Sequence, residues 1–271
     1  MFTKTATAVI NTQALKHNYT QLRRLCPNSQ ILSILKANAY GHGLERVAKA
    51  LDGTDAIGVA RIDEALSLRA SGITKSIILL EGFFDASDLP ILAVNGFETI
   101  VHNFAQLEAI EEADLSHAIK VWLKIDTGMH RLGIAPEYFE TFYRRLNLSK
   151  NVQKPIILMS HLACADEPEN SHTKAQIAQF NSITSQFTEK ESLANSAGAL
   201  SWPESRLEWI RPGLLLFGVS PMNTGTAEGI HFKPVMTLKS RVIDIRKIQA
   251  GESVGYGAAW QCQNDTRIAV I

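Results

Sequence analysis

The stretch that decides the fold is residues 31–43, ILSILKANAYGHG, in which a short apolar run ends at Lys36. A run of this length, rich in Ile and Leu, is typical of a strand that is buried on both faces of a parallel sheet. An open, doubly wound sheet that binds a dinucleotide would carry a glycine-rich loop after its first strand. Residues 36–43 do not form such a loop, so the segment argues against that fold.

Seven further apolar runs follow, and helical patterns separate most of them. The eight expected strands are residues 31–35, 56–60, 77–80, 98–101, 120–125, 156–160, 192–195 and 208–210. The expected helices include residues 44–51, 62–70, 104–113, 136–146 and 173–188, and a first helix opened by Asn11 as its N-cap. Parallel neighbours need a crossover, and eight strands close a (β/α)8 barrel. We therefore predict an α/β protein in which residues 1–232 form a TIM-type barrel, with an open sheet as the alternative.

The pattern changes near residue 233. Residues 234–248 contain strand-like sequence without a helix, Gly251 and Glu252 suggest a turn, and strand-like sequence resumes at Val254. Residues 233–271 are therefore expected to be the start of an all-β domain. Because so short a β region scarcely forms its own core and the sequence stops inside the apolar run 268–271, we expect the chain to be a fragment of a longer protein.

Composition limits the partners of the chain. Lys plus Arg and Asp plus Glu each number 27, so the formal net charge is zero, without the basic excess of a nucleic-acid or membrane-surface binder. The three cysteines, Cys26, Cys164 and Cys262, lack metal-ligand spacing and favour a reducing compartment. The first residues lack the apolar core of a signal peptide. We expect a cytoplasmic protein without a metal, a nucleic-acid partner or a membrane partner.

Polar residues follow several expected strands at their carboxyl ends, where barrels place their active sites. They include Lys36, Asp126, Thr127, Arg131, His161, Asn195, Ser196, Arg211 and Gly213. A lysine at a barrel opening that is partly shielded from water has a lowered pKa, and its amine can form a bond to a carbonyl carbon. The position alone is also compatible with a lysine whose amine extends to solvent or pairs with an acidic side chain. Ser196 and residues 211–214 follow the seventh and eighth strands, where barrels commonly bind phosphate. With Arg211 for the pyridine nitrogen, this layout suits pyridoxal phosphate.

Six motifs resemble, in order, those of the alanine racemase family. They are SILKANAYGHG (33–43), KIDTGMHRLG (124–133), SHLACAD (160–166), NSAG (195–198), RPGLLLFGVSP (211–221) and SVGYGAAW (253–260). The resemblance runs from about Thr5 to the last residue. It implies a barrel that binds pyridoxal 5'-phosphate, a β domain, and a head-to-tail homodimer whose sites are shared between full-length subunits. It also implies the racemisation of L- and D-alanine, which supplies D-alanine for cell-wall (peptidoglycan) synthesis or converts it for catabolism.

The resemblance implies two catalytic bases. Lys36 would hold the cofactor and serve the D-enantiomer, and Tyr256 would serve the L-enantiomer from the partner subunit. Racemisation independently requires two proton-transfer groups, because a proton leaves one face of Cα and returns to the other. Lysine and tyrosine have ordinary pKa values near about 10.4 and 10, so both need tuning to act near neutrality.

The other site residues also follow from the resemblance. The phosphate would be bound by Tyr40, Ser196, Gly213 and Leu214. Arg211 would face the pyridine nitrogen, with His161 between Arg211 and Tyr256 in a hydrogen-bonded chain. Arg131 would contact the phenolic oxygen of the cofactor and the carboxylate of the substrate. Lys124 occupies a position where the family often carries a carbamylated lysine that orients this arginine.

Two other classes share a barrel and this cofactor. A single-barrel carrier without turnover would end with its barrel, whereas this chain continues into a β region with Tyr256. A barrel decarboxylase of basic amino acids would carry a cysteine-containing motif in place of SVGYGAAW, and Cys262 lies in no such motif. Alanine is thus the expected substrate, with serine not excluded.

Overall fold

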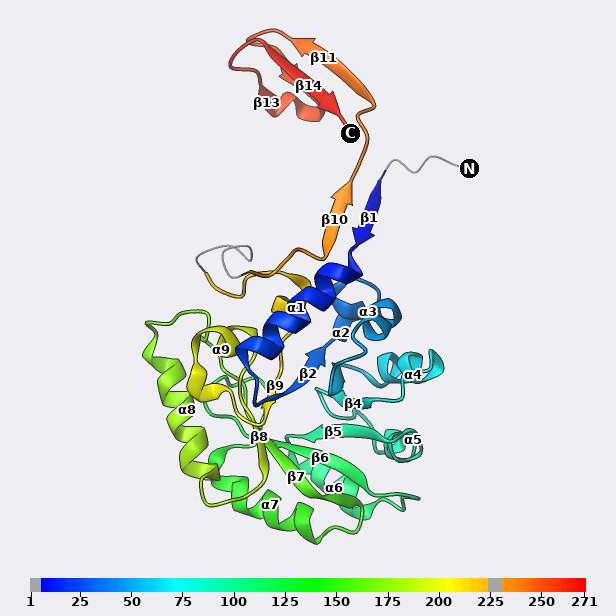
Figure 1. Ribbon diagram of the computed structural model, residues 1–271, viewed down its shortest axis with the longest axis vertical. Coiled ribbons are helices and arrows are strands. Elements are labelled where there is room, and N and C mark those ends of the chain that lie inside the picture. The colour runs from blue at the N-terminus through cyan, green and yellow to red at the C-terminus, as the bar shows by residue number, and fades with distance from the viewer. Residues whose placement is uncertain (1–5, 224–230) are drawn as a thin grey trace. The chain divides into compact units, whose positions relative to one another are not determined.

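The structure is a computed structural model that describes residues 6–223 and 231–271 (Figure 1). The chain divides into two compact units. The first is Asn11–Val235, and the second joins the N-terminal residues up to Ile10 to Met236–Ile271. The first unit ends near residue 232, where the sequence analysis placed its boundary, and the described residues 6–10 belong to the second unit.

The first unit is a closed barrel of eight parallel strands, so the predicted TIM-type fold is confirmed (Figure 1). In order around the barrel, the strands are β2 (Gln30–Ile34), β3 (Ala56–Val59), β4 (Ser76–Leu79), β5 (Phe97–Val101), β6 (Ile119–Lys124), β7 (Val152–Met159), β8 (Lys190–Ser192) and β9 (Trp209–Ile210). Pairing of β9 with β2 closes the barrel. The carboxyl ends of all eight strands therefore meet at one rim.

Helices connect the strands. They are α1 (Thr12–Leu25), α2 (Lys36–Tyr40), α3 (Leu44–Ala50), α4 (Ile62–Ala70), α5 (Leu89–Asn95), α6 (Phe104–Glu112), α7 (Phe139–Leu148), α8 (Ser171–Thr184) and α9 (Ser196–Ser201), with short 3-10 turns such as η4 (Leu214–Phe217). As predicted, Asn11 caps α1: its side-chain oxygen accepts hydrogen bonds from the N–H groups of Gln13 and Ala14, each 3.0 Å long.

The barrel interior is filled with side chains. Its buried cluster consists of Leu32, Ile34, Ala56, Ile78, Ile100, Trp122, Ile157, Met159 and Trp209. The indole rings of Trp122 and Trp209 meet edge to face at 5.4 Å, and the Trp122 N–H donates to buried Glu98 at 2.7 Å. A packed interior leaves the strand ends as the place for a ligand.

The second unit consists of short antiparallel pairs. Strand β1 (Thr7–Ile10) pairs with β10 (Met236–Lys239), β11 (Asp244–Ile248) with β14 (Thr266–Val270), and β12 (Ser253–Val254) with β13 (Trp260–Gln261) (Figure 1). The predicted β region after the barrel is confirmed, and β1 adds a strand that the sequence analysis did not separate from the barrel. Cys262 is the one buried residue among the described residues of this unit.

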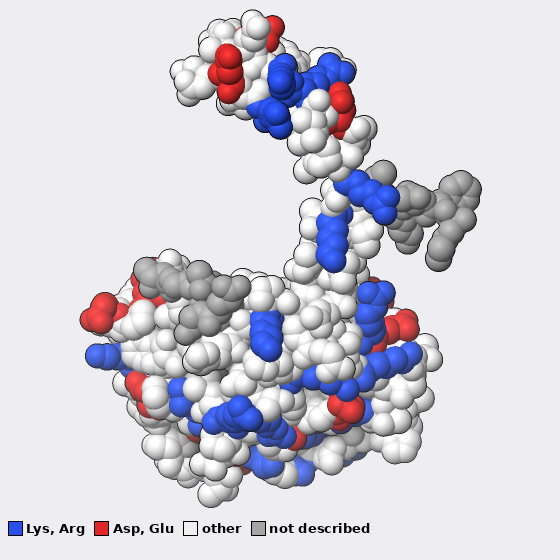
Figure 2. Space-filling model, turned by 45° about the horizontal axis from the view of Figure 1, so that its top comes forward, with Lys and Arg blue, Asp and Glu red and all other residues white. Residues whose placement is uncertain are grey.

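The surface carries both signs of charge. Figure 2 shows Lys and Arg side chains together with Asp and Glu on the visible face of each unit, in line with the balanced composition. Within residues 6–223 and 231–271, no helix combines the length and the apolar character that crossing a membrane requires.

Candidate active site

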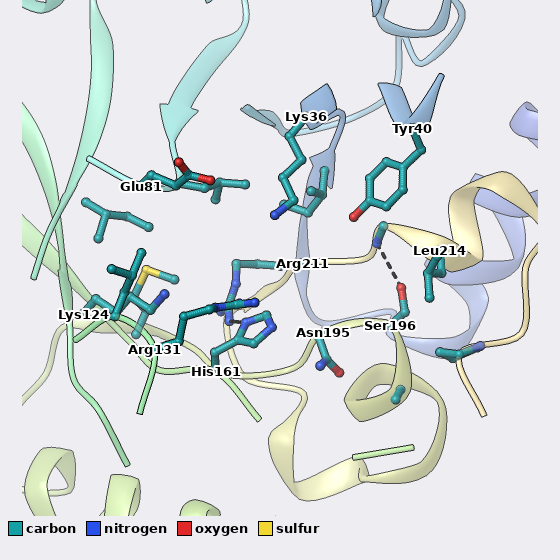
Figure 3. A pocket seen from close by; sticks show the side chains of 18 of the residues that line it. Lys36, Tyr40, Glu81, Lys124, Arg131, His161, Asn195, Ser196, Arg211 and Leu214 are labelled. Carbon is teal, nitrogen blue, oxygen red and sulfur yellow. Dashed lines mark hydrogen bonds between the residues drawn. The ribbon is translucent and has the colours of Figure 1, made fainter. Parts of the chain in front are cut away.

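A cavity of about 480 Å³ lies in the barrel unit and is lined by residues from the strand ends and the loops that follow them. Nine of the ten predicted site residues line it: Lys36, Tyr40, Lys124, Arg131, His161, Ser196, Arg211, Gly213 and Leu214. In Figure 3, the Lys36 amine and the Tyr40 hydroxyl point toward the same space as Arg211, His161 and Ser196. The tenth residue, Tyr256, lies in the second unit and is fully exposed in this chain.

The backbone after Lys36 has an unusual conformation. Strand β2 ends at Ile34, and Lys36 begins α2 instead of ending the strand as expected. Residues 37–40 have φ angles of 53° or 54°, so α2 contains a left-handed turn made of four non-glycine residues. Such a conformation costs roughly 1–2 kcal/mol per residue. The turn presents the side chains of Lys36 and Tyr40 to one cavity (Figure 3).

A cradle of N–H and O–H groups lies across the cavity from Lys36. The Ser196 hydroxyl accepts hydrogen bonds from the N–H groups of Gly213 at 2.9 Å and Leu215 at 3.4 Å, and Figure 3 shows the first of these. A Cβ atom added to Gly213 would lie 2.5 Å from the Tyr40 hydroxyl oxygen, so glycine is the residue that allows this approach. Burial raises the pKa of Tyr40, which keeps its hydroxyl a donor at neutral pH. This arrangement suits a phosphate group.

Arg211 is buried beneath the cavity and held at both terminal nitrogens. Its Nη1 donates to the Ser192 hydroxyl at 2.6 Å, and its Nη2 donates to the Ser160 carbonyl at 2.5 Å and to His161 Nδ1 at 3.2 Å. Burial lowers the pKa of Arg211 to about 9, so the guanidinium keeps its charge at neutral pH. The structure thus contains the link between Arg211 and His161 in the predicted hydrogen-bonded chain.

His161 is a neutral acceptor in this arrangement. Its Nδ1 accepts a hydrogen bond from Nη2 of Arg211 and therefore carries no proton itself. Burial lowers the pKa of His161 well below its ordinary value, and the charges of Arg211, Lys124, Arg131 and Lys36 act in the same direction. The imidazole therefore stays uncharged near pH 7.

Lys124 adds a further cation to the same wall. It is buried, and burial together with Arg211, Arg131 and Lys36 lowers its pKa to about 8. A substantial share of neutral amine is therefore present near pH 8. The four basic groups favour an anionic ligand in this cavity.

Sequence reasoning missed two carboxylates, Glu81 and Asp166, that also line the cavity. Glu81 stands two residues beyond the end of β4, and Asp166 closes the SHLACAD motif. Extending the strand-end argument to the third expected strand, residues 77–80, would have found Glu81. Figure 3 places Glu81 on the same side of the cavity as Lys36.

Comparison with protein families decides the identity of the chain. The family model described as "Alanine racemase, N-terminal domain" matches residues 10–221, and "Alanine racemase, C-terminal domain" matches residues 235–271. The chain belongs to the alanine racemase family. The resemblance drawn from the six motifs is therefore confirmed, and neither the carrier nor the decarboxylase class is supported.

Curated alanine racemases are similar to nearly the whole chain. The alanine racemase of Aliivibrio salmonicida is 52% identical over 266 residues, which cover 98% of this chain and 74% of the relative. That of Vibrio cholerae is 51% identical over 268 residues, which cover 99% of this chain and 74% of the relative.

Solved alanine racemase structures share the fold. The biosynthetic alanine racemase of Pseudomonas aeruginosa has 37% identity and a TM-score of 0.94, and the match covers 98% of this chain and 75% of that chain. The alanine racemase of Bartonella henselae, solved with covalently bound pyridoxal phosphate, has 28% identity and a TM-score of 0.86 with the same coverage.

The residues of this cavity fit pyridoxal phosphate. The Ser196 hydroxyl, whose oxygen accepts from the Gly213 N–H, and the Tyr40 hydroxyl each have an O–H group to donate to a phosphate, and Gly213 leaves space that a Cβ would fill. Lys36 supplies an amine for an aldehyde carbon, and Arg211 supplies a fixed donor for a ring nitrogen. Each part of the cofactor has a chemically matched group in one cavity.

Proposed function

We propose that this cavity binds pyridoxal phosphate on Lys36 and is the site at which the chain, as an alanine racemase, interconverts L- and D-alanine. The observation that carries this assignment is that Lys36, the Ser196–Gly213 cradle and buried Arg211 line one cavity. When bound, pyridoxal phosphate withdraws electrons from the substrate Cα and so makes its proton easier to remove. The protein then has to hold the reactants and move the proton.

Lys36 and Tyr256 are the two proton-transfer groups in this proposal. The amine of Lys36 takes or returns the Cα proton on the face that serves D-alanine, and the Tyr256 hydroxyl does so on the opposite face. Tyr256 lies outside the cavity-forming unit, and its side chain is fully exposed and so available to a second copy of the chain. We therefore propose a homodimer in which each barrel receives Tyr256 from its partner.

Arg211 and His161 set the properties of the ring-nitrogen end of the cavity. A charged guanidinium donates a hydrogen bond and does not give up its proton near neutral pH, so it keeps the facing ring nitrogen unprotonated. His161 accepts from Arg211 and holds it in place. An unprotonated ring withdraws electrons more weakly, which limits side reactions such as transamination.

Arg131 and Lys124 are proposed to recognise the acidic groups of the ligands. Arg131 lines the cavity and would contact the phenolic oxygen of the cofactor and the carboxylate of alanine. Lys124 would react as a neutral amine with carbon dioxide, forming an N–C bond and releasing one proton. The resulting carbamate would carry negative charge into a group of cations and orient Arg131.

We also propose that the protein works in the cytoplasm. Cys26, Cys164 and Cys262 are free thiols in the structure, which suits a reducing compartment.

Borohydride reduction followed by peptide mass mapping tests the cofactor assignment. We expect the mass of the reduced cofactor on the peptide that contains Lys36 in the wild-type chain. A Lys124→Ala variant is the matched control and should keep the label on Lys36. Label on another lysine, or none after incubation with pyridoxal phosphate, would contradict the proposed function.

A further inference from the structure

The left-handed turn after Lys36 needs support from residues outside the cavity. Four successive non-glycine residues, 37–40, have positive φ angles, a conformation that L-residues adopt only when their surroundings impose it. Neither Lys36 nor Tyr40 makes a side-chain hydrogen bond to the described residues that would fix the turn. The turn has backbone hydrogen bonds, such as that from the Ala39 N–H to the Leu35 carbonyl at 2.8 Å, and neighbouring side chains that contact its backbone add further support.

Two side chains hold the first half of the turn. The carboxylate of Glu64 accepts a hydrogen bond from the Asn38 N–H at 3.2 Å. The side-chain oxygen of Asn38 accepts one from the Leu44 N–H at 2.9 Å. These contacts fix Asn38, whereas the Ala39 carbonyl at the other end of the turn accepts the backbone N–H of His42 at 3.0 Å and has room for a side-chain donor as well.

His42 holds the second half. Its Nδ1 lies 3.0 Å from the carbonyl oxygens of both Ala39 and Tyr40. Carbonyl oxygens only accept hydrogen bonds, so Nδ1 carries a proton and donates to both of them. The geometry therefore fixes Nδ1 as a donor nitrogen of the ring.

The ring of His42 also connects the turn to the cradle. It stacks on Phe217 with a centroid distance of 4.3 Å and an interplanar angle of 27°, and the Tyr40 ring contacts the same phenylalanine at 5.1 Å. Phe217 is the last residue of η4, which begins at Leu214 directly after Gly213. His42 and Tyr40 thus both contact Phe217, which joins the turn to the segment that follows Gly213.

We infer that His42 is a positioning residue for cofactor binding, which acts through Tyr40. Its Nδ1–H fixes the two carbonyls of the turn, and its ring fixes the turn against Phe217. The Tyr40 hydroxyl is thereby held above Gly213, where a phosphate is bound in the proposed function on which this inference rests. His42 itself is not among the residues that line the cavity.

Substitutions at His42 separate the hydrogen bond from the ring contact. His42→Asn keeps an N–H donor near the Nδ1 position, whereas His42→Gln moves the donor toward the Nε2 position and His42→Phe keeps only the ring. Titration of the apoprotein with pyridoxal phosphate, followed by absorbance, should give about tenfold weaker binding for His42→Gln and His42→Phe. His42→Asn should stay within about threefold of the wild type. Equal affinity in all four proteins, or equal loss in all three variants, would overturn the inference.

A double-mutant cycle tests whether His42 acts through Tyr40. In a Tyr40→Phe background, His42→Gln should weaken binding by less than about twofold, because the hydroxyl that it positions is absent. A full tenfold loss in that background would show that His42 supports the fold generally and would contradict the proposed route. The thermal midpoint of each apoprotein serves as the control for stability.

Nitrogen-15 NMR of the imidazole in the cofactor-free chain gives a readout that is independent of activity. We expect His42 to carry a proton on Nδ1. A proton on Nε2 alone would overturn the inference while leaving the proposed function intact. Failure of the wild-type chain to bind pyridoxal phosphate on Lys36 would instead refute the proposed function, so the two failures are distinguishable.

Discussion

The barrel unit and the second unit differ in how far they bury their apolar side chains. Strands β3 and β5 of the barrel are buried along their whole length. In the second unit, Leu238 is 79% exposed and Ile243 is 69% exposed. The barrel therefore buries its apolar strands within one chain, whereas the second unit leaves large apolar side chains exposed.

The same contrast holds for the functional residues. Nine of the predicted site residues line the barrel cavity, while Tyr256 stands fully exposed in the second unit. In the proposed function, the barrel therefore holds the cofactor and the second unit contributes a proton-transfer group.

The largest expected effect comes from removing the base of each unit in turn. Lys36→Ala should abolish the absorbance of the lysine-bound cofactor and lower racemisation at least about a thousandfold. Tyr256→Phe should lower racemisation to a similar extent and leave the cofactor absorbance and affinity unchanged, because Tyr256 lies outside the cavity-forming unit. Both quantities are measured on the same samples. A loss of cofactor affinity in Tyr256→Phe would break the division of roles.

Alanine substitutions at one glycine of each unit test further whether the barrel alone binds the cofactor. In Gly213→Ala, the new Cβ would lie 2.5 Å from the Tyr40 hydroxyl oxygen, so we expect cofactor affinity to fall by about tenfold or more. Gly255→Ala is the control in the second unit, where an added Cβ meets no atom within 4 Å although φ is +79°. It should leave the affinity unchanged. Equal cofactor affinities for Gly213→Ala and the wild type would contradict a phosphate site at Ser196, Gly213 and Tyr40.

A smaller effect is expected from Lys124. Its folded-state pKa of about 8 lies below the ordinary 10.5, so the unfolded chain binds more protons between these values and stability rises with pH in that window. Carbamylation would remove the buried positive charge at lower pH. Adding bicarbonate at pH 8 should therefore raise the thermal midpoint of the barrel by about 2–4 °C.

The same addition of bicarbonate should leave the thermal midpoint of the Lys124→Met variant unchanged. Lys120→Met is the matched control, because Lys120 pairs with Glu98 at 3.3 Å and lies outside the cavity. The thermal midpoint of Lys120→Met should still rise when bicarbonate is added. A bicarbonate effect in Lys124→Met, or none in the wild type, would contradict carbamylation of this lysine.

The smallest effect concerns His161. Its folded-state pKa lies well below 6.5, so the unfolded chain takes up a proton as pH falls below 6.5 and the folded chain does not. Stability is therefore lost with acidification. His161→Asn keeps an acceptor for Arg211 without titrating, and urea denaturation between pH 7 and 5 should show a shallower loss. The control variant His117→Asn, at an exposed histidine, should lose stability with falling pH as steeply as the wild type. The same pH dependence of stability in the wild type and both variants would contradict a buried neutral His161.

The barrel was predictable from sequence because its strands are short apolar runs separated by helices. The expected strand 56–60 and β3 (Ala56–Val59) differ by one residue, and the expected helix 62–70 coincides with α4 (Ile62–Ala70). The seventh strand is displaced, since β8 (Lys190–Ser192) ends where strand 192–195 was expected to begin. Its sequence contains polar residues, so the apolar pattern that marks the other strands is weak there.

The site was predictable in composition and not in backbone geometry. Residue type and strand-end position indicated six of the site residues, Lys36, Arg131, His161, Ser196, Arg211 and Gly213. The motifs added Tyr40, Lys124, Leu214 and Tyr256. The left-handed turn of residues 37–40 has no local signal, because Ala and Tyr ordinarily avoid positive φ. It depends on contacts from Glu64 and His42, which become neighbours only in the folded barrel.

Mixing two inactive variants tests the central claim most directly. Lys36→Ala and Tyr256→Phe chains are co-refolded, heterodimers are counted by native mass spectrometry, and racemisation is followed by incorporation of solvent deuterium at Cα. If each barrel uses Tyr256 of the partner subunit, one site of every heterodimer carries both intact residues. The mixture should then recover about a quarter of the wild-type activity per subunit when exchange is random. Absence of heterodimers, or heterodimers as inactive as their parents, would contradict a site built from the barrel of one chain and the second unit of another.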